Sequence, residues 1–172
     1  MACWSAGLIR ARMAWHWGIE MTLDYDGLGR AIRSLTDGET DAVALMATVA
    51  CEVHHAHPLC DWTGFYRVVA PELLKIGPYQ GGHGCLVIPF ARGVCGACAR
   101  TGQVRNVPDV EAFAGHIACA TSTRSELVLP VWTGAGGLLG VFDLDSNTPA
   151  AFTPEDEAFF TTLLADVFRD AV

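Results

Sequence analysis

The chain has 172 residues, 51% of them hydrophobic and 17% charged, which is enough for one domain with a sizeable core. Its net charge of −8, with 11 scattered Lys and Arg residues, argues against general binding to nucleic acids or anionic membranes. No stretch approaches the roughly 18–20 apolar residues of a membrane span, and the first residues lack the apolar run of a signal peptide.

The cysteines point to a reducing environment. There are seven of them, an odd number, and their spacings differ from those of a small secreted scaffold. We therefore expect a cytoplasmic location, where thiols serve redox or metal chemistry more than structural crosslinks. Residues 1–20 match no helix or strand pattern, so we expect a poorly ordered extension or the product of an upstream start codon. The domain is then expected over residues 21–172.

Apolar residues at helical spacing predict a first helix over residues 40–57, which Pro58 ends. Three histidines lie near its end: His54, His55 and His57. Polar or cationic side chains commonly complement the dipole at a helix C-terminus, and the paired spacing of a structural zinc site is missing here. We therefore favour a structural role for these histidines.

Strands are predicted next. Residues 61–70 are aromatic and β-branched, and residues 73–76 are the expected hairpin partner. A glycine-rich loop follows over 77–84, without the spacing of a phosphate-binding loop. It leads to Cys85 and to a short apolar strand over 86–88.

A short helix is predicted over residues 93–100, with Gly102 ending it. Cys95 lies near its N-terminus, where unpaired amides and the helix dipole are expected to stabilise a thiolate. Cys98 follows three residues later, so the two could form a disulfide that constrains nothing else in the fold.

The residue pattern in the second half of the chain predicts a short strand at 105–107, a hairpin of strands 126–132 and 138–144, and a terminal helix beginning at Thr153. This helix carries one apolar stripe and is expected to pack on the sheet. Antiparallel hairpins dominate, so we predict an α+β fold with a central antiparallel sheet of about six strands, flanked by the N-terminal and C-terminal helices.

The long loop before residue 126 brings together a thiol, an imidazole and a carboxylate, namely Cys119, His116 and Glu126. This is the inventory that a thiolate nucleophile needs. Asp143 and Asp145 lie two apart at the end of a predicted strand, so they share one face. Three carboxyls crowded in a half-buried pocket should raise at least one pKa, because like charges disfavour joint ionisation.

Eight segments together resemble the free methionine-(R)-sulfoxide reductases, enzymes built on one GAF domain. The resemblance spans about residues 40–170 and rests on D-W-T-G-F-Y (61–66), G-P-Y-Q-G (77–81), C-L-V-I-P-F (85–90), G-V-C-G (93–96), V-P-D-V (107–110), G-H-I-A-C (115–119), S-E-L-V-L-P (125–130) and G-V-F-D-L-D-S (140–146). The chain departs from the family pattern at Ala120, where the family usually has Asp, and at Cys98, an additional cysteine.

The resemblance implies a role for each matching residue. It implies that Cys119 is the nucleophile, Cys85 the main resolving cysteine and Cys95 an auxiliary resolver. It also implies that acidic residues hold the sulfoxide oxygen and the substrate amino group, while aromatic residues line the methyl-sulfoxide end. The acidic residues are Glu126, Asp143 and Asp145, and the aromatic ones are Trp62 and Tyr66. His116 is a possible support for the thiolate.

The implied reaction is reduction of free L-methionine-(R)-sulfoxide by thiolate attack, through a sulfenic acid and an intramolecular disulfide between Cys85 and Cys119. The resemblance implies no bound cofactor or metal. Thioredoxin, recycled by an NADPH-dependent reductase, is the expected reductant, and a homodimer is compatible with the pattern. Two alternatives stay open: a non-catalytic GAF sensor of a small ligand, and a zinc module made from Cys95, Cys98, His116 and Cys119.

Overall fold

The computed structural model describes residues 23–113, 115 and 121–172. Its elements in chain order are α1 (Tyr25–Leu35), α2 (Ala42–Ala56), β1 (Trp62–Ala70), β2 (Leu73–Gln80), β3 (Val87–Pro89), α3 (Gly93–Thr101), β4 (Arg105–Val107), the 3-10 helix η1 (Val110–Ala112), β5 (Ser125–Trp132), β6 (Leu138–Ser146) and α4 (Pro154–Val167). The strands form one six-stranded sheet in the order β3-β2-β1-β6-β5-β4, and all neighbours are antiparallel. The predicted α+β class is confirmed.

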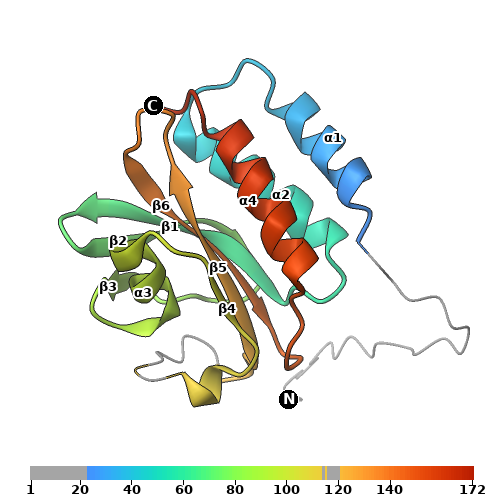
Figure 1. Cartoon of the computed structure of the whole chain (residues 1–172). Coiled ribbons are helices and arrows are strands. Elements are labelled where there is room, and N and C mark those ends of the chain that lie inside the picture. The colour runs from blue at the N-terminus through green and yellow to red at the C-terminus, as the bar shows by residue number, and fades with distance from the viewer. Residues whose placement is uncertain (1–22, 114, 116–120) are drawn as a thin grey trace, which may run out of the picture.

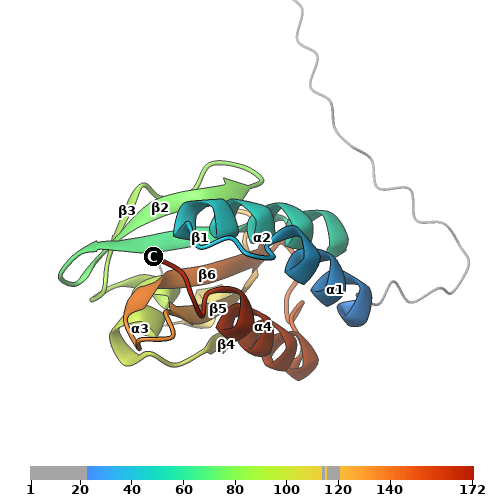
Figure 2. The same ribbon diagram turned by 90° about the horizontal axis from the view of Figure 1, so that it is seen from above.

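The sheet has a different cover on each face. Helices α1, α2 and α4 lie on one face of the sheet and α3 lies on the other, as both Figure 1 and Figure 2 show. Because successive side chains along a strand point to opposite faces, the central strands β1, β5 and β6 contribute side chains to both faces of the sheet. The result is two separate apolar clusters, a larger one under the three helices and a smaller one under α3.

Aromatic rings fill the larger cluster. The ring centroids of Phe65 on β1 and Phe142 on β6 lie 4.6 Å apart, and Phe168, just after α4, lies 5.6 Å from Phe65. Phe160 on α4 meets Phe142 edge-on at 5.8 Å. Rings at these separations gain more than their buried area alone provides, so they hold α4 onto β1 and β6.

Helix ends follow their sequence signals. Asp41 accepts hydrogen bonds from the amides of Val43 and Ala44 and so caps α2. Thr153 and Asp156 form a reciprocal capping box at the start of α4. Gly102 ends α3 in the left-handed region at φ 65°, where a side chain would be strained.

One of the three histidines has a role that the sequence did not indicate. His57 caps α2, and its Nε2 lies 3.2 Å from Oδ1 of Asp156, with both side chains buried. Tyr25 of α1 donates a hydrogen bond to the same carboxylate at 2.9 Å. Asp156 therefore joins α1, α2 and α4, whereas we had attributed His57 to the helix dipole alone.

One helix was missed and one predicted boundary was wrong. Helix α1 was not predicted, although Asp24 caps it by accepting from the amide of Gly27. The predicted glycine-rich loop begins too early, because β2 continues to Gln80. After a register shift at Gly77 and Pro78, Tyr79 and Gln80 pair with Gly64 and Thr63 of β1. Tertiary pairing with a long neighbouring strand has here overridden local glycine and proline signals. The predicted extension at residues 1–20 lies outside the described residues.

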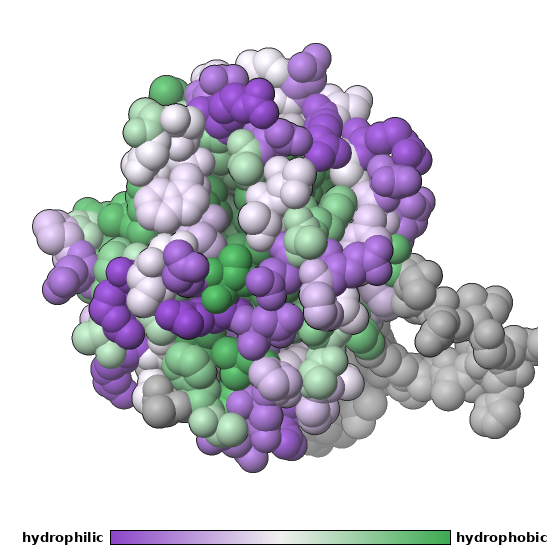
Figure 3. Space-filling model, in the orientation of Figure 1, coloured by the Kyte–Doolittle hydropathy of each residue, from purple (hydrophilic) through white to green (hydrophobic). Residues whose placement is uncertain are grey.

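No helix in the described ranges has the length and apolar character needed to cross a bilayer. On the face shown in Figure 3, hydrophilic residues gather along the upper and right-hand margins, and apolar residues appear between them as small separate patches. Such scattered apolar exposure is ordinary for a folded domain.

Candidate active site

Strand register brings the predicted acidic residues together on the α3 face. Asp145 of β6 pairs with Trp62 of β1 on one side and with Glu126 of β5 on the other. Asp143 lies two residues earlier on β6 and shares the face of Asp145, as predicted. Three carboxyls from two adjacent strands therefore converge next to an aromatic residue of the third strand.

Two of these carboxyls are buried and in contact with a thiol. Glu126 is 6% exposed and Asp143 is 4% exposed. The Sγ atom of Cys95, on α3, lies 3.8 Å from Oε1 of Glu126, and the ligating atoms of all three residues lie within 4.8 Å of one another. Asp145 is half-buried at the margin of the group.

All three carboxyls hold their protons more tightly than usual. Burial, followed by the neighbouring charges of Asp143 and Asp145, raises the pKa of Glu126 well above its ordinary value. Burial likewise raises the pKa of Asp145, with Asp143 and Asp61 adding to the effect. Burial raises the pKa of Asp143 to about 7, against the opposing hydrogen bonds from Cys95 and Glu126. The predicted rise is confirmed, but desolvation contributes more than like-charge repulsion.

An aromatic stack forms the wall beside the acids. Trp62 and Tyr66 stack with centroids 5.8 Å apart, and Tyr79 of β2 also stacks with Trp62, at 5.5 Å. The indole Nε1 of Trp62 donates to the carbonyl of Gly82 at 3.1 Å, which fixes the ring. Tyr79 was missed as a wall residue. The available signal was the small residue Gly64, which lies opposite Tyr79 in the β1–β2 register.

Glycines let the chain approach this wall closely. A Cβ on Gly64 would lie 2.4 Å from Cβ of Tyr79 and 2.6 Å from the Trp62 ring. A Cβ on Gly84 would lie 2.8 Å from the hydroxyl of Tyr66 and 3.2 Å from the Trp62 ring. The segment after β2 therefore lies directly against the two predicted aromatic residues.

Cys95 does not have the thiolate character expected from its place at a helix N-terminus. It is the third residue of α3 and is 3% exposed. Burial, with the negative charges of Asp143 and Glu126, raises its pKa well above the ordinary value. Desolvation and two carboxyls outweigh the dipole of a nine-residue helix.

The other cysteines are placed differently. Cys98 is buried, its Sγ lies 3.7 Å from the carbonyl of Val128, and burial raises its pKa to about 12. Cys95 and Cys98 are both free thiols. Cys85 packs against the α3-side cluster and is disulfide-bonded.

The predicted nucleophile lies outside the described residues. This applies to Cys119, to the supporting His116 and to the departure at Ala120. The proposed Cys85–Cys119 pairing therefore stays a prediction. The two ends of that loop are described: Gly115 accepts from the amide of Gly93, the first residue of α3, and β5 starts at Ser125. The two described ends of the loop therefore lie beside the start of α3 and next to Glu126.

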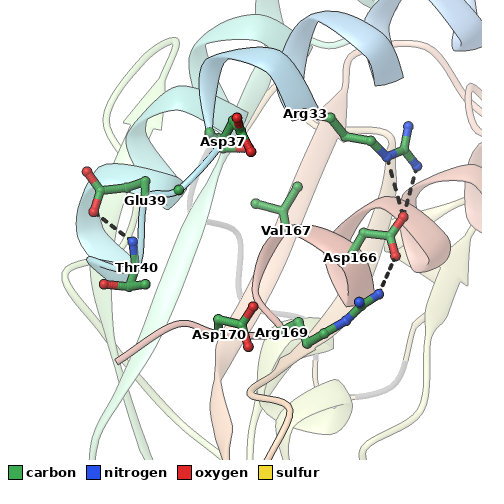
Figure 4. A pocket seen from close by; sticks show the side chains of 10 residues that line it. Arg33, Asp37, Glu39, Thr40, Asp166, Val167, Arg169 and Asp170 are labelled. Carbon is green, nitrogen blue, oxygen red and sulfur yellow. Dashed lines mark hydrogen bonds and ion pairs between the residues drawn. The ribbon is translucent and has the colours of Figure 1, made fainter.

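A separate cavity of about 350 Å³ lies on the helical side of the sheet, between the end of α1 and the end of α4. Figure 4 shows Arg33 and Arg169 both directed at Asp166, with N–O distances of 3.1 and 2.9 Å. These groups are substantially exposed and already paired, so the cavity has the character of a solvated surface and not of a catalytic site.

Comparison with known proteins identifies the family of the chain. The GAF domain family matches residues 26–169. The free methionine-R-sulfoxide reductase of Escherichia coli is 37% identical over 143 residues, covering 83% of this chain and 86% of that protein. The enzyme of the same name from Saccharomyces cerevisiae is 35% identical over 159 residues, covering 89% and 84%.

A solved structure gives the same result. The free methionine-R-sulfoxide reductase of Neisseria meningitidis, determined in complex with its substrate, superposes with a TM-score of 0.78 at 37% identity, covering 83% of this chain and 85% of that one. The chain therefore belongs to the GAF domain family and, within it, to the free methionine-R-sulfoxide reductases.

Proposed function

We propose that the chain reduces free L-methionine-(R)-sulfoxide to L-methionine. The observation that carries the proposal is the cluster of Glu126, Asp143 and Asp145 beside the stacked rings of Trp62 and Tyr66. An acidic wall and an aromatic wall meet on one face of the sheet. They match the two ends of methionine sulfoxide, a charged amino acid and a methyl sulfoxide. The names of the Escherichia coli and yeast relatives support the same substrate.

The acidic cluster can do two things at once. Burial raises the pKa of Asp143 to about 7 and that of Glu126 well above its usual range. At least one carboxyl therefore keeps a proton near neutral pH and can donate it to the sulfoxide oxygen. The remaining negative charge suits the α-ammonium of a free amino acid. A methionine residue within a peptide lacks that ammonium, so the cluster favours the free substrate.

The proposed chemistry uses two thiols in turn. The thiolate of Cys119 attacks the sulfoxide sulfur while the oxygen takes a proton, and methionine leaves as the cysteine becomes a sulfenic acid. The Cys85 thiol then attacks that sulfur, water leaves and a disulfide forms. A dithiol such as thioredoxin returns both cysteines to thiols by exchange and is itself oxidised. The raised pKa of Cys95 supports Cys85 over Cys95 as the resolving thiol, because a thiol that stays protonated attacks slowly.

A coupled assay tests the proposal. Purified protein with thioredoxin, thioredoxin reductase and NADPH should consume NADPH on free L-methionine-(R)-sulfoxide, with little turnover of the S epimer or of peptide-bound sulfoxide. Cys119→Ser should abolish turnover. Cys85→Ser should release at most one methionine per chain in the first turnover. Cys51→Ser, on α2 beneath the opposite face of the sheet, is the matched control and should retain activity.

The assay also separates the alternative function. Absence of turnover by folded, fully reduced protein would contradict the enzyme proposal. Binding of the sulfoxide without turnover, measured by calorimetry, would instead favour a GAF sensor that recognises a small ligand.

A further inference from the structure

The buried group formed by Cys95, Glu126 and Asp143 has the donor set of a metal site. One thiol sulfur and two carboxyl oxygens lie within 4.8 Å of one another, and all three residues are buried. Cys95 is in α3, and the two acids are on the neighbouring strands β5 and β6. All three ligands therefore come from regular elements that position them rigidly.

A second observation points to a missing partner within this group. Cys95 and Glu126 hydrogen-bond to the Asp143 carboxyl. Its Oδ1 atom, however, is buried and has no hydrogen-bond partner among the residues that the structure describes. Within the same residues, no Lys, Arg or His forms an ion pair with Glu126 or Asp143. A buried carboxyl oxygen without a donor is costly and uncommon in proteins. A cation placed between the three groups would satisfy it.

The separation between the Cys95 sulfur and a Glu126 oxygen suits a small tetrahedral ion. Zinc bonds to sulfur at about 2.3 Å and to oxygen at about 2.0–2.2 Å, so ligand atoms in a tetrahedral site lie roughly 3.3–3.7 Å apart. The Sγ of Cys95 and the Oε1 of Glu126 are 3.8 Å apart, close to that separation. The soft sulfur selects zinc or cobalt over magnesium and calcium, which prefer all-oxygen ligands.

We propose that Cys95, Glu126 and Asp143 bind one thiophilic divalent cation, with zinc as the natural candidate and water as the fourth ligand, and that this ion inhibits the enzyme. The binding stands on the donor geometry alone. The inhibition rests on the proposed function, because there the same two carboxyls receive the ammonium of methionine sulfoxide. Zinc and substrate should therefore exclude one another.

Cobalt(II) is the probe for binding, because a cobalt–thiolate bond adds charge-transfer absorption that oxygen ligands alone do not give. The titration uses the full chain with the Cys85 disulfide intact, which removes that thiol as a competing ligand. We expect one equivalent of cobalt to bind with a thiolate band, and one equivalent of zinc to displace it. Magnesium in excess should leave the band unchanged.

Variants identify the ligands. Cys95→Ser should abolish the thiolate band, and Glu126→Gln should weaken binding at least tenfold while keeping the side-chain shape. Cys98→Ser is the matched control, because Cys98 lies one turn further along α3 and its sulfur contacts the carbonyl of Val128. This variant should bind cobalt as the parent does. Equal loss in Cys98→Ser would overturn the proposal in favour of a site made from the Cys-x-x-Cys pair, and an intact band in both Cys95→Ser and Glu126→Gln would also overturn it.

Competition tests the inhibition separately. Excess free methionine-(R)-sulfoxide should raise the apparent cobalt dissociation constant, and zinc should slow methionine release in a single turnover of reduced protein, which needs no thioredoxin. Cobalt binding that is indifferent to the sulfoxide overturns the competitive part of the proposal. A protein that binds cobalt as described but never reduces the sulfoxide without metal refutes the proposed function and leaves the metal site standing.

Discussion

At the scale of single residues, the site is defined by three acids, of which Glu126 and Asp143 are buried and Asp145 is half-buried. Asp143 and Phe142 are adjacent on β6 and face opposite sides of the sheet, one toward α3 and one into the larger core. The sheet thus separates the aromatic core from the face that holds the acids of the site. Burial makes the charged form of Asp143 unfavourable, so the folded protein keeps a proton that the unfolded chain releases.

The pH dependence of stability should report this proton. The pKa of Asp143 rises from 3.8 to about 7, so between these values the folded state binds more protons than the unfolded state. The free energy of unfolding should then fall as pH rises through this window, by at most about 4 kcal/mol for a three-unit shift. Asp143→Asn carries no titrating group, so its stability relative to the parent should increase from about pH 4 to about pH 8.

Urea unfolding at a series of pH values measures this difference. Asp37→Asn, a loop substitution with the same change of charge, is the control. Its free energy of unfolding should vary with pH in parallel with that of the parent. Parallel curves for Asp143→Asn as well would show that Asp143 does not hold the proton.

At the scale of elements, the segment after β2 is held against the aromatic stack of β1. Its contacts are the Gly82 carbonyl, which accepts from Trp62, and Gly84, which approaches both Trp62 and Tyr66. No side chain fits between Gly84 and these rings, so the backbone itself forms part of the wall. The wall therefore depends on rings from β1 and β2 and on two glycines of the segment that follows β2.

A pair of glycine substitutions tests this contact. Gly84→Ala would place a Cβ 2.8 Å from the Tyr66 hydroxyl, so the aromatic wall or the segment must shift. We expect the KM for methionine sulfoxide to rise by several-fold with a smaller effect on stability. Gly82→Ala is the control, because a Cβ there meets nothing within 4 Å and should leave the KM unchanged. Equal KM values for the two variants would contradict the assigned contact.

The start of α4 is the second element-scale feature. Hydrogen bonds from His57, Thr153 and Tyr25 lower the pKa of Asp156 to about 2, although burial alone would raise it. A carboxylate with a depressed pKa stabilises the fold above its unfolded value near pH 4, and this contribution is lost as pH falls through about 2.

Asp156→Asn should therefore lower the free energy of unfolding at neutral pH by about 2–3 kcal/mol, which corresponds to a shift of nearly two pKa units. The difference from the parent should shrink as the pH falls toward about 2. Thermal and urea unfolding measure it, and Glu155→Gln, exposed on the same helical turn, should change stability by less than about 0.5 kcal/mol. An equally stable Asp156→Asn protein at neutral pH would show that the network contributes little.

At the scale of the whole molecule, one sheet serves two clusters. Strands β1, β5 and β6 contribute side chains to the larger core under α1, α2 and α4 and to the smaller cluster under α3. A disturbance on the helical side must therefore pass through the same backbone that positions the acids. The two sides should unfold together.

Phe142→Leu tests this coupling. Loss of the ring contacts with Phe65 and Phe160 should lower stability by on the order of 1–2 kcal/mol. Far-ultraviolet circular dichroism and tryptophan fluorescence should shift by the same amount in a single transition. Leu35→Ala is the control, since Leu35 is 60% exposed and its loss should change stability little. A fluorescence change that precedes the loss of circular dichroism would show that the site unfolds separately.

Much of the fold could be read from the sequence, because the signals are local. Asp41 and the Thr153-Pro154 pair mark helix starts by supplying hydrogen-bond acceptors or a suitable backbone angle, and both helices begin there. Alternation along β6 placed Asp143 and Asp145 on one face. The sequence motifs also identified the family to which the chain belongs. Where local signals were misleading, as at the end of β2, pairing of Tyr79 and Gln80 with β1 decided the structure.

Electrostatics and long-range partners were decided only by the tertiary structure. The sequence alone predicted a stabilised thiolate at Cys95, and the buried contact with Glu126 reversed that expectation. The partnership of His57 with Asp156, 99 residues later, has no local signal. Sequence determines which groups can react and which face of a strand they occupy. Their pKa values depend on burial and on neighbours that meet only when the sheet and its helices are assembled.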